Sequence, residues 1–462
     1  MVRAPMRVAR RALLAWCALT LLLLVSLAGL WLWRAGDGFE LAIQRGPISN
    51  LPVTLAAAAM TWLLGGSFLL LLSSGKLDAQ NALAWTGFFL VAMVYLNLLR
   101  ERPEYGDIEY YTRAAFDLAA GNPLPPQYFY PPLWAALLAW LTPLGEDGLF
   151  LAVWLFNLLG LLTFYFLLGR LLERYGFPSS LAALATTVFM LANAPLLRTM
   201  VYMQVNLHVL NAVFLSLLLF RRSPALSALA MAMAVHLKAS PAALVLAFLL
   251  AWDLRWLAWA ALWMLVVGLL PAAGFGFSPY LDFFHNALGL AAGHGLSFRE
   301  TSFDGLFTAL GEFLNLAPAL VRIGVYTCKA ALLAAALWVM RRNVQRETFV
   351  SGSDARPYNA FPSLLILMTL ASPIVWEHHG VFVGLSFLLL LKKLDSPSEW
   401  ALFGFAYFFE FLLPTFDLFP WSYGRLVAPL VVLGLTWKVA GRGDDSPLFE
   451  RARRWLAKIP RF

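Results

Sequence analysis

The segment from Arg100 to Pro132 has the sequence RERPEYGDIEYYTRAAFDLAAGNPLPPQYFYPP. Its first eighteen residues carry eight charged side chains, whereas long apolar runs lie on both sides of it. A helix that crosses a bilayer does not need such a density of charge, because charged side chains are costly in hydrocarbon. We therefore interpret this segment as the place where chemistry occurs and the apolar runs as its membrane-embedded support.

The composition indicates a membrane protein. The chain has 462 residues, of which 61% are hydrophobic and 13% are charged, whereas a soluble domain carries about 25% charged residues. We expect an all-α fold, a polytopic transmembrane bundle of about 12–14 membrane segments. The net charge of +8 comes from basic residues at the ends of apolar runs, which is typical of membrane anchoring and does not indicate a nucleic-acid partner. Both cysteines, Cys17 and Cys328, lie in apolar runs, so we expect neither a disulfide framework nor a zinc site.

The apolar runs predict where the membrane helices lie. The first run is longer than the core of a signal peptide and ends in the bulky sequence WLWR, so we interpret it as a retained span. The segment 131–142 covers only about 18 Å at 1.5 Å per residue, which favours a half-inserted or surface-lying helix. The predicted spans lie near 12–33, 52–73, 82–99, 149–171, 181–197, 205–220, 256–275, 318–340, 360–374, 379–392, 400–413 and 424–439.

Lysine and arginine predict the sidedness of these spans. With the N-terminus inside, one assignment places nearly all basic clusters on the inner side, including the basic tail 441–462. The acidic loops 100–148 and 276–317 then lie on the opposite side. We therefore expect a multi-pass protein of the cell membrane with both termini cytoplasmic, an outward-facing active site and a tail helix on the inner leaflet.

The segment 225–251 lies between two inner basic clusters, yet it is too short to cross the bilayer twice. Pro241 favours a helix break, so we predict a short intramembrane helical hairpin whose tip contains His236, Lys238 and Ser240. A lysine at this depth costs roughly 2.5–3.5 kcal/mol unless it finds a partner. It either snorkels to the outer interface or binds an anion such as a lipid phosphate.

Asp107 and Glu109 are the candidate general bases of the first outer loop. On a helix their spacing would point them about 200° apart, whereas in an extended turn they would lie on one side and could hold a divalent cation. One carboxylate near the outer interface is sufficient for a general base. The alternative for Asp107 is a structural one, because an aspartate after Gly106 could simply cap a helix N-terminus.

Two further polar pairs lie at predicted outer helix ends. His378 and His379 are adjacent, so both cannot face one metal from a helix, and the zinc interpretation is weak. Gln204 and Asn206 either cap a loop or hydrogen-bond a sugar or headgroup. Phosphate-binding loops, dinucleotide fingerprints and lipase elbows are all missing from the sequence.

In combination, these segments resemble GT-C membrane glycosyltransferases, and most closely glycosyltransferase family 87, the polyprenol-phosphate-mannose-dependent α-mannosyltransferases. The resemblance covers about residues 82–435. It rests on the order and outward placement of Asp107, Tyr110-Tyr111, Ala115, Gly121-Asn122-Pro123, Tyr130-Pro131-Pro132-Leu133, Gln204-Val205-Asn206, His236-Leu237-Lys238 with Pro241, and Ser372-Pro373 with Trp376, His378 and His379. Met203 departs from the glycine that the family commonly has before Gln-x-Asn, and the segment 300–303 is only the nearest match to the motif of the second outer loop.

The resemblance implies an inverting hexosyltransferase, with mannose as the expected sugar and a lipid or glycan hydroxyl as the acceptor. It implies a catalytic module over 82–440 with outward juxtamembrane helices, two additional N-terminal helices in 1–81, and no metal or other cofactor. Asp107 would be the catalytic base. The implied ligands of the donor phosphate are Lys238, Arg299, His378 and His379, and the implied substrate-binding residues are Glu109, Tyr111, Tyr130, Gln204, Asn206 and Trp376.

Other functions are compatible with parts of this pattern. A lipid-linked sugar transporter or flippase would also line a pathway with intramembrane polar residues, although the sequence has no inverted repeat. A GT-C enzyme could use another lipid-linked sugar, or act on protein or lipid A. A non-catalytic assembly partner is the remaining alternative.

Overall fold

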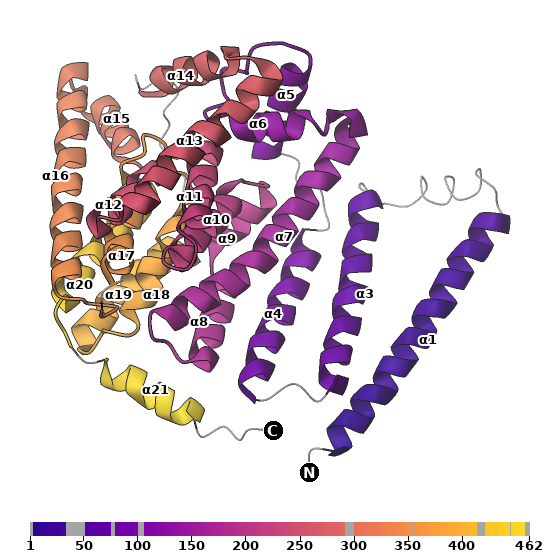
Figure 1. Cartoon of the computed structure of the whole chain (residues 1–462). Helices are drawn as coiled ribbons and strands as arrows, with labels where there is room; N and C mark the ends of the chain where they lie inside the picture. Colours follow the sequence, from indigo (N-terminus) through magenta and orange to yellow (C-terminus); the bar gives the residue numbers. More distant parts are fainter. Residues whose placement is uncertain are drawn as a thin grey trace.

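The computed structural model describes residues 3–33, 51–74, 79–99, 106–291, 300–352, 355–413, 421–443 and 445–457. Every regular element within these ranges is helical, so the prediction of an all-α fold is confirmed. Figure 1 shows a bundle of roughly parallel and antiparallel helices with shorter helices lying across one end.

Three described helices are long and apolar enough to cross a membrane. They are α7 (Gly145–Arg174), α13 (Leu254–Phe275) and α16 (Pro318–Gln345). A fourth candidate is the pair α8 (Ser179–Leu191) and α9 (Ala194–Val201), which bends by 63° between its two parts. The predicted count of about 12–14 membrane segments stays a prediction.

Many of the remaining helices overlap the predicted apolar runs, with ends shifted by a few residues, whereas others lie in the predicted outer loops and in the tail. The remaining helices are α1 (Arg3–Trp33), α3 (Leu51–Ser74), α4 (Ala79–Leu98), α5 (Asp107–Ala119), α6 (Pro132–Ala139), α10 (Asn206–Leu219), α11 (Pro224–Leu237), α12 (Val245–Ala251), α14 (Ser278–Ala291), α15 (Phe303–Leu314), α17 (Ala355–Leu370), α18 (Gly384–Leu390), α19 (Pro397–Tyr407), α20 (Gly424–Val439) and α21 (Pro447–Ala457).

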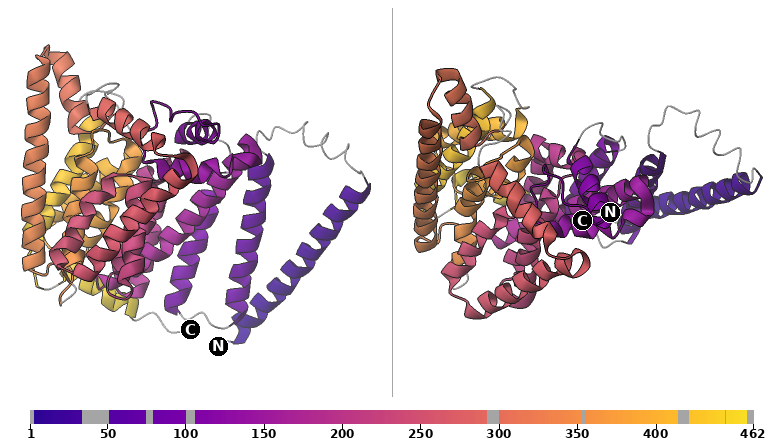
Figure 2. Two further views of the ribbon diagram at one scale, coloured as in Figure 1. Left: turned by 45° about the horizontal axis from the view of Figure 1, so that its top comes forward. Right: turned by 90° about the horizontal axis from the view of Figure 1, so that it is seen from above.

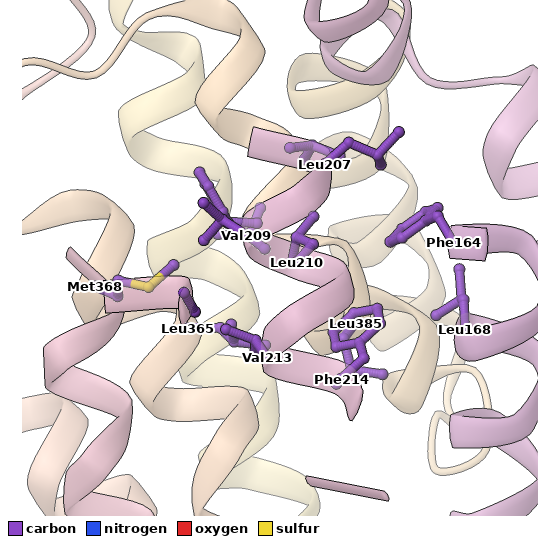
Figure 3. Packing of buried hydrophobic residues seen from close by; sticks show 14 of the residues in the cluster. Phe164, Leu168, Leu207, Val209, Leu210, Val213, Phe214, Leu365, Met368 and Leu385 are labelled. Atoms are coloured by element: carbon purple, nitrogen blue, oxygen red, sulfur yellow. The ribbon is translucent and has the colours of Figure 1, made fainter. Parts of the chain in front are cut away.

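Helix α10 occupies the centre of the core. Figure 3 shows its Val213 and Phe214 near Leu365 of α17, Phe164 of α7 and Leu385 of α18. All five side chains are buried. Because lipid tails are as apolar as these residues, the helices associate mainly through close packing. This packing gives α10 a fixed position, and the residues just before it belong to the candidate site.

The two predicted outer loops meet at one end of the bundle. Helices α5, α6 and α14 lie at the top in Figure 1, whereas the start of α1 and the tail helix α21 lie at the bottom. The relative placement agrees with the predicted sidedness, and the orientation in a bilayer stays a prediction. Helix α1 stands at the outer edge of the bundle beside α3 (Figure 2), where Trp16 stacks on Trp62 with ring centroids 5.6 Å apart.

The predicted break near Pro241 is present. Helix α11 ends at Leu237, Lys238 is extended with φ −154° and ψ 130°, and a 3-10 turn runs from Ser240 to Leu244. Proline without an amide hydrogen fits the first positions of this turn. The break presents the Lys238 side chain at the end of a short apolar helix instead of within one. The location of this tip inside a bilayer stays a prediction.

Candidate functional site

A cavity of about 980 Å³ lies where the outer loops meet the Lys238 break. It is lined by side chains from α5, the loop before α6, the break itself, α14, the end of α17 and the segment 372–379. Six of the eleven predicted site residues line it. They are Asp107, Tyr130, Lys238, Trp376, His378 and His379.

Asp107 is the first residue of α5 and is only 7% exposed. Gly106 is the N-cap, and no side chain caps the helix, so the interpretation of Asp107 as a structural cap is wrong. A Cβ at Gly106 would lie 3.3 Å from the Cα of Tyr202. The missing side chain therefore lets the start of α5 approach the end of α9 closely.

The environment of Asp107 changes its acidity. Burial raises the pKa of Asp107 from its ordinary 3.8 to about 7, against the lowering effects of the Lys238 charge and a hydrogen bond with Tyr130. A base with a pKa near the working pH combines a useful deprotonated fraction with real basicity. The pKa of the Tyr130 hydroxyl is raised well above its usual 10, chiefly by burial. Tyr130 therefore stays protonated and acts as a hydrogen-bond donor.

Glu109 lies on the opposite face of α5 and is exposed. Because both carboxylates are on a helix, they diverge, and an extended turn holding a cation does not form. Glu109 does not line the cavity. The structure therefore brings one of the two candidate bases to the cavity.

Lys238 is held by neutral groups. Its Nζ atom donates to Asn206 Oδ1 at 2.8 Å and lies 2.5 Å from His379 Nε2. The same atom lies 5.6 Å from the ring centre of Tyr130 and 5.3 Å from that of Phe382. Within the described part of the chain, no carboxylate lies within 4.0 Å of this ammonium group.

A layer of polar side chains lies behind the cavity wall. Gln204 Oε1 accepts hydrogen bonds from Tyr111 at 2.9 Å and from Tyr130 at 3.2 Å. Gln204 and Tyr111 are fully buried and do not line the cavity. The predicted role of both residues in substrate binding stays a prediction; in the structure Gln204 Oε1 joins the hydroxyl groups of the two tyrosines.

Asn206 has a similar supporting role. While Oδ1 accepts from Lys238, its Nδ2 donates to the carbonyl oxygen of His378 at 3.4 Å. Asn206 is fully buried and does not line the cavity. It joins Lys238 to the segment 376–379, called the histidine segment because it contains His378 and His379.

Met203 stands where the family commonly has glycine, and its backbone conformation shows why glycine suits this position. Its φ of 54° is in the left-handed region, which costs an L-residue about 1–2 kcal/mol and suits glycine. The turn before Gln204 and Asn206 therefore requires a left-handed backbone conformation, which glycine adopts without strain. Met203 adopts it with its side chain buried.

The histidine segment is fixed by its own backbone. The backbone N–H of Trp376 donates to Nδ1 of His379 at 2.9 Å, so the neutral ring carries its proton on Nε2, the atom that faces Lys238. His378 lines the cavity, and its buried Nε2 has no hydrogen-bond partner in the described structure. Arg299, the remaining predicted phosphate ligand, lies outside the described residues.

The family model of glycosyltransferase family 87 matches residues 128–373, more than half of the chain. The chain belongs to glycosyltransferase family 87. The matched range includes Tyr130, Gln204, Asn206 and Lys238, but it begins after Asp107. No curated protein and no solved structure matches the chain.

Two walls of this glycosyltransferase cavity differ in character. The apolar wall consists of Ala243, which follows the Lys238 break, and Leu367, Met368 and Ala371 at the end of α17. The polar wall consists of Gln127, His285 and Asn286. Asn286 Nδ2 joins α14 to the loop before α6 by donating to the carbonyl oxygens of Pro125 at 3.0 Å and Tyr128 at 3.1 Å.

The sequence did not single out a second carboxylate of the cavity. Glu300 lines the cavity and is 3% exposed. The next two residues hold it there, because Thr301 donates to the carbonyl oxygen of Val375 and Ser302 to that of Pro373, both through side-chain hydroxyls at 2.8 Å. The segment 300–303, which is only the nearest match to the family's motif in the second outer loop, therefore contributes Glu300 to the cavity wall.

Metal ligation has no candidate in the described residues. Within them, no group of three or more His, Cys, Asp or Glu side chains is arranged to hold a metal ion.

Proposed function

We propose that this glycosyltransferase transfers a hexose, with mannose as the expected sugar, from a polyprenyl-phosphate donor to a hydroxyl of a lipid or glycan acceptor. The reaction inverts the anomeric carbon and takes place at the outer face of the cytoplasmic membrane. The observation that carries this proposal is that Asp107, Lys238 and His379 line one cavity although they are far apart in the sequence. One residue is a base, and the others can bind an anionic leaving group.

The Lys238–His379 pair favours a bound phosphate. In the neutral histidine described above, Nε2 carries a hydrogen and faces the ammonium group at 2.5 Å, so two donors point at each other. An anion that accepts from both relieves this conflict and adds a negative charge next to an ammonium group whose direct hydrogen-bonding contacts are neutral. A phosphate monoester supplies such an acceptor, and His378 Nε2 can bind another of its oxygens.

Asp107 supplies the base on the acceptor side. Its carboxylate takes the proton from the acceptor hydroxyl while the hydroxyl oxygen attacks the anomeric carbon. The bond between the anomeric carbon and the phosphate oxygen breaks, and its electron pair leaves with polyprenyl phosphate. Lys238 stabilises the charge that develops on this oxygen. The proton on Asp107 passes to solvent before the next turnover.

The apolar wall supports a lipid-linked donor. Ala243, Leu367, Met368 and Ala371 lie on elements in contact with each other, close to Lys238. A lipid chain can pack against this wall while its phosphate contacts Lys238. Nucleotide sugars are cytosolic, so an outward-facing site also favours a lipid donor.

A donor–acceptor screen in proteoliposomes tests the proposal. Polyprenyl-phosphate mannose, polyprenyl-phosphate glucose and nucleotide sugars are offered with glycolipid acceptors, and the linkage of the product is determined by mass spectrometry. Transfer from a polyprenyl-phosphate hexose with inversion is the expected result. Transfer from nucleotide sugars alone contradicts the lipid donor, whereas lipid-linked sugar flux without transfer favours the transporter.

A further inference from the structure

We propose that Arg425 is a positioning residue of the transfer reaction, which clamps Glu377 and thereby fixes the two histidines against Lys238. This inference rests on the proposed function, because it assigns those histidines to the donor phosphate. Arg425 is the second residue of α20 and lies outside both the cavity lining and the range matched by the family model.

Two arginines hold the Glu377 carboxylate. Arg425 approaches Glu377 Oε1 at 3.1 Å, and Arg198 of α9 approaches Oε2 at 3.5 Å. The side chains of Arg425 and Glu377 are 7% and 10% exposed, whereas that of Arg198 is 43% exposed. Charge pairs are worth more where solvent screening is low, so Arg425 is the stronger of the two partners.

Arg425 is itself anchored to a third element. Its Nε donates to the carbonyl oxygen of Glu410 at 3.3 Å, and its guanidinium also donates to the carbonyl oxygen of Leu413. Glu410 belongs to a π-helical turn, Phe408–Leu412, that follows α19. The guanidinium group therefore joins α20, this turn and the histidine segment.

The position of Glu377 determines the positions of His378 and His379, because the three residues are consecutive in one turn. Glu377 begins the 3-10 turn Glu377–Val383, which contains His378 and His379. The turn has little room to shift, because a Cβ at Gly380 would overlap a carboxylate oxygen of Glu410. Thr199 also donates to the carbonyl oxygen of His378, at 3.2 Å. A displaced Glu377 carries the imidazole rings with it.

A buried ion pair is a poor device for stability, because desolvation of both charges offsets much of their attraction. The Arg425–Glu377 pair lies next to the two cavity histidines, where exact placement of donors around a developing charge has most effect on rate. This location favours a role in geometry over a role in stability alone.

The test uses the full-length protein in nanodiscs, with Arg425→Gln, Glu377→Gln and the double variant. Two readouts are measured: transfer kinetics, and carbethoxylation of His378 and His379 by diethylpyrocarbonate, located by peptide mass spectrometry. We expect kcat to fall by about 10²-fold, as for a misplacement near 1 Å, with the acceptor KM unchanged. We also expect faster modification of both cavity histidines, while His236 keeps its wild-type rate.

The double variant distinguishes positioning from two independent defects. If Arg425 acts through Glu377, the double variant loses no more activity than the more severe single variant. Arg442→Gln is the matched control, because Arg442 pairs with buried Glu399 near the tail. It removes a comparable ion pair remote from the cavity and should leave kcat and histidine reactivity unchanged.

Wild-type histidine reactivity and kcat in folded Arg425→Gln would overturn the inference. Multiplicative losses in the double variant would also overturn it. If Arg425→Gln does not fold, Arg425→Lys retains the charge but not the forked contacts, and the same two readouts apply to it. Should no polyprenyl-phosphate donor support transfer, the proposed function fails, but histidine reactivity still tests the clamp.

Discussion

Replacement of Asp107 by asparagine should separate activity from stability. The amide keeps the size of the side chain but cannot accept the hydroxyl proton. A positioned general base contributes about 10²–10⁴-fold to a rate, which corresponds to roughly 3–5 kcal/mol at about 1.4 kcal/mol for each tenfold. We therefore expect kcat of Asp107→Asn to fall by at least about 10²-fold, while the donor still binds through Lys238.

The same variant should be more stable than the wild type, although it is less active. Raising the pKa of Asp107 from 3.8 to about 7 corresponds to an upper limit of about 4 kcal/mol for the cost of its buried charge. Because the folded pKa is raised, this cost is absent below pH 3.8, grows between pH 3.8 and about 7, and is complete above about 7. Asparagine removes it, but also removes the partner charge of Lys238, so the net gain is smaller.

The assay compares thermal unfolding and initial rates of wild type and Asp107→Asn at pH 5 and pH 8. The stability advantage of the variant should be larger at pH 8. Asp117→Asn is the matched control, because Asp117 lies on the same helix, is 31% exposed, and pairs with Arg113 at 3.8 Å. It should alter stability by less than about 0.5 kcal/mol and leave the rate unchanged. A normal transfer rate in Asp107→Asn would refute its role as base, and a lower melting temperature at pH 8 would refute the cost of burial.

Four further predictions use the same proteoliposome assay. The wild-type kcat/KM should fall tenfold per pH unit below about 7, because Asp107 must be deprotonated; a flat profile between pH 5 and 8 would contradict this. Lys238→Ala should raise the donor KM by about tenfold or more, the effect of losing roughly 1.5–3 kcal/mol from a charged hydrogen bond, and unchanged donor affinity would rule out the phosphate role. Glu109→Gln should retain full activity, since this carboxylate is exposed, and a large loss would restore it as a candidate base. Gln204→Leu should lower the free energy of unfolding by about 1–3 kcal/mol per unpaired tyrosine hydroxyl while the acceptor KM stays unchanged; direct sugar binding by Gln204 would instead raise that KM.

The sequence alone determined most of the helical framework. Long apolar runs form helices whether or not their partners are known, since every backbone polar group must be paired within the segment in hydrocarbon. For this reason α7 contains the predicted span 149–171, and α16 contains 318–340. The break at Lys238 was also predictable, because a lysine and Pro241 interrupt an apolar segment too short to cross the membrane twice.

Only the tertiary structure decided what the polar residues do. Helical spacing implied that Asp107 and Glu109 diverge, but the rotation of α5 in its packing decided which of them lines the cavity. The side chain of Gln204 could cap a loop or bind a substrate on sequence grounds, and the packing places its amide oxygen against two tyrosine hydroxyls.

The contact between Arg425 and Glu377 could not be predicted from the sequence either. The Arg425–Glu377 pair joins residues 48 positions apart in sequence, and neither residue differs locally from an ordinary charge at a helix end. Periodicity determines which side chains share a face of one helix, whereas the contact between two helices depends on how all of them pack together. The sequence therefore singled out a candidate base, a candidate phosphate-binding lysine and a histidine pair, and the fold determined that they line one cavity.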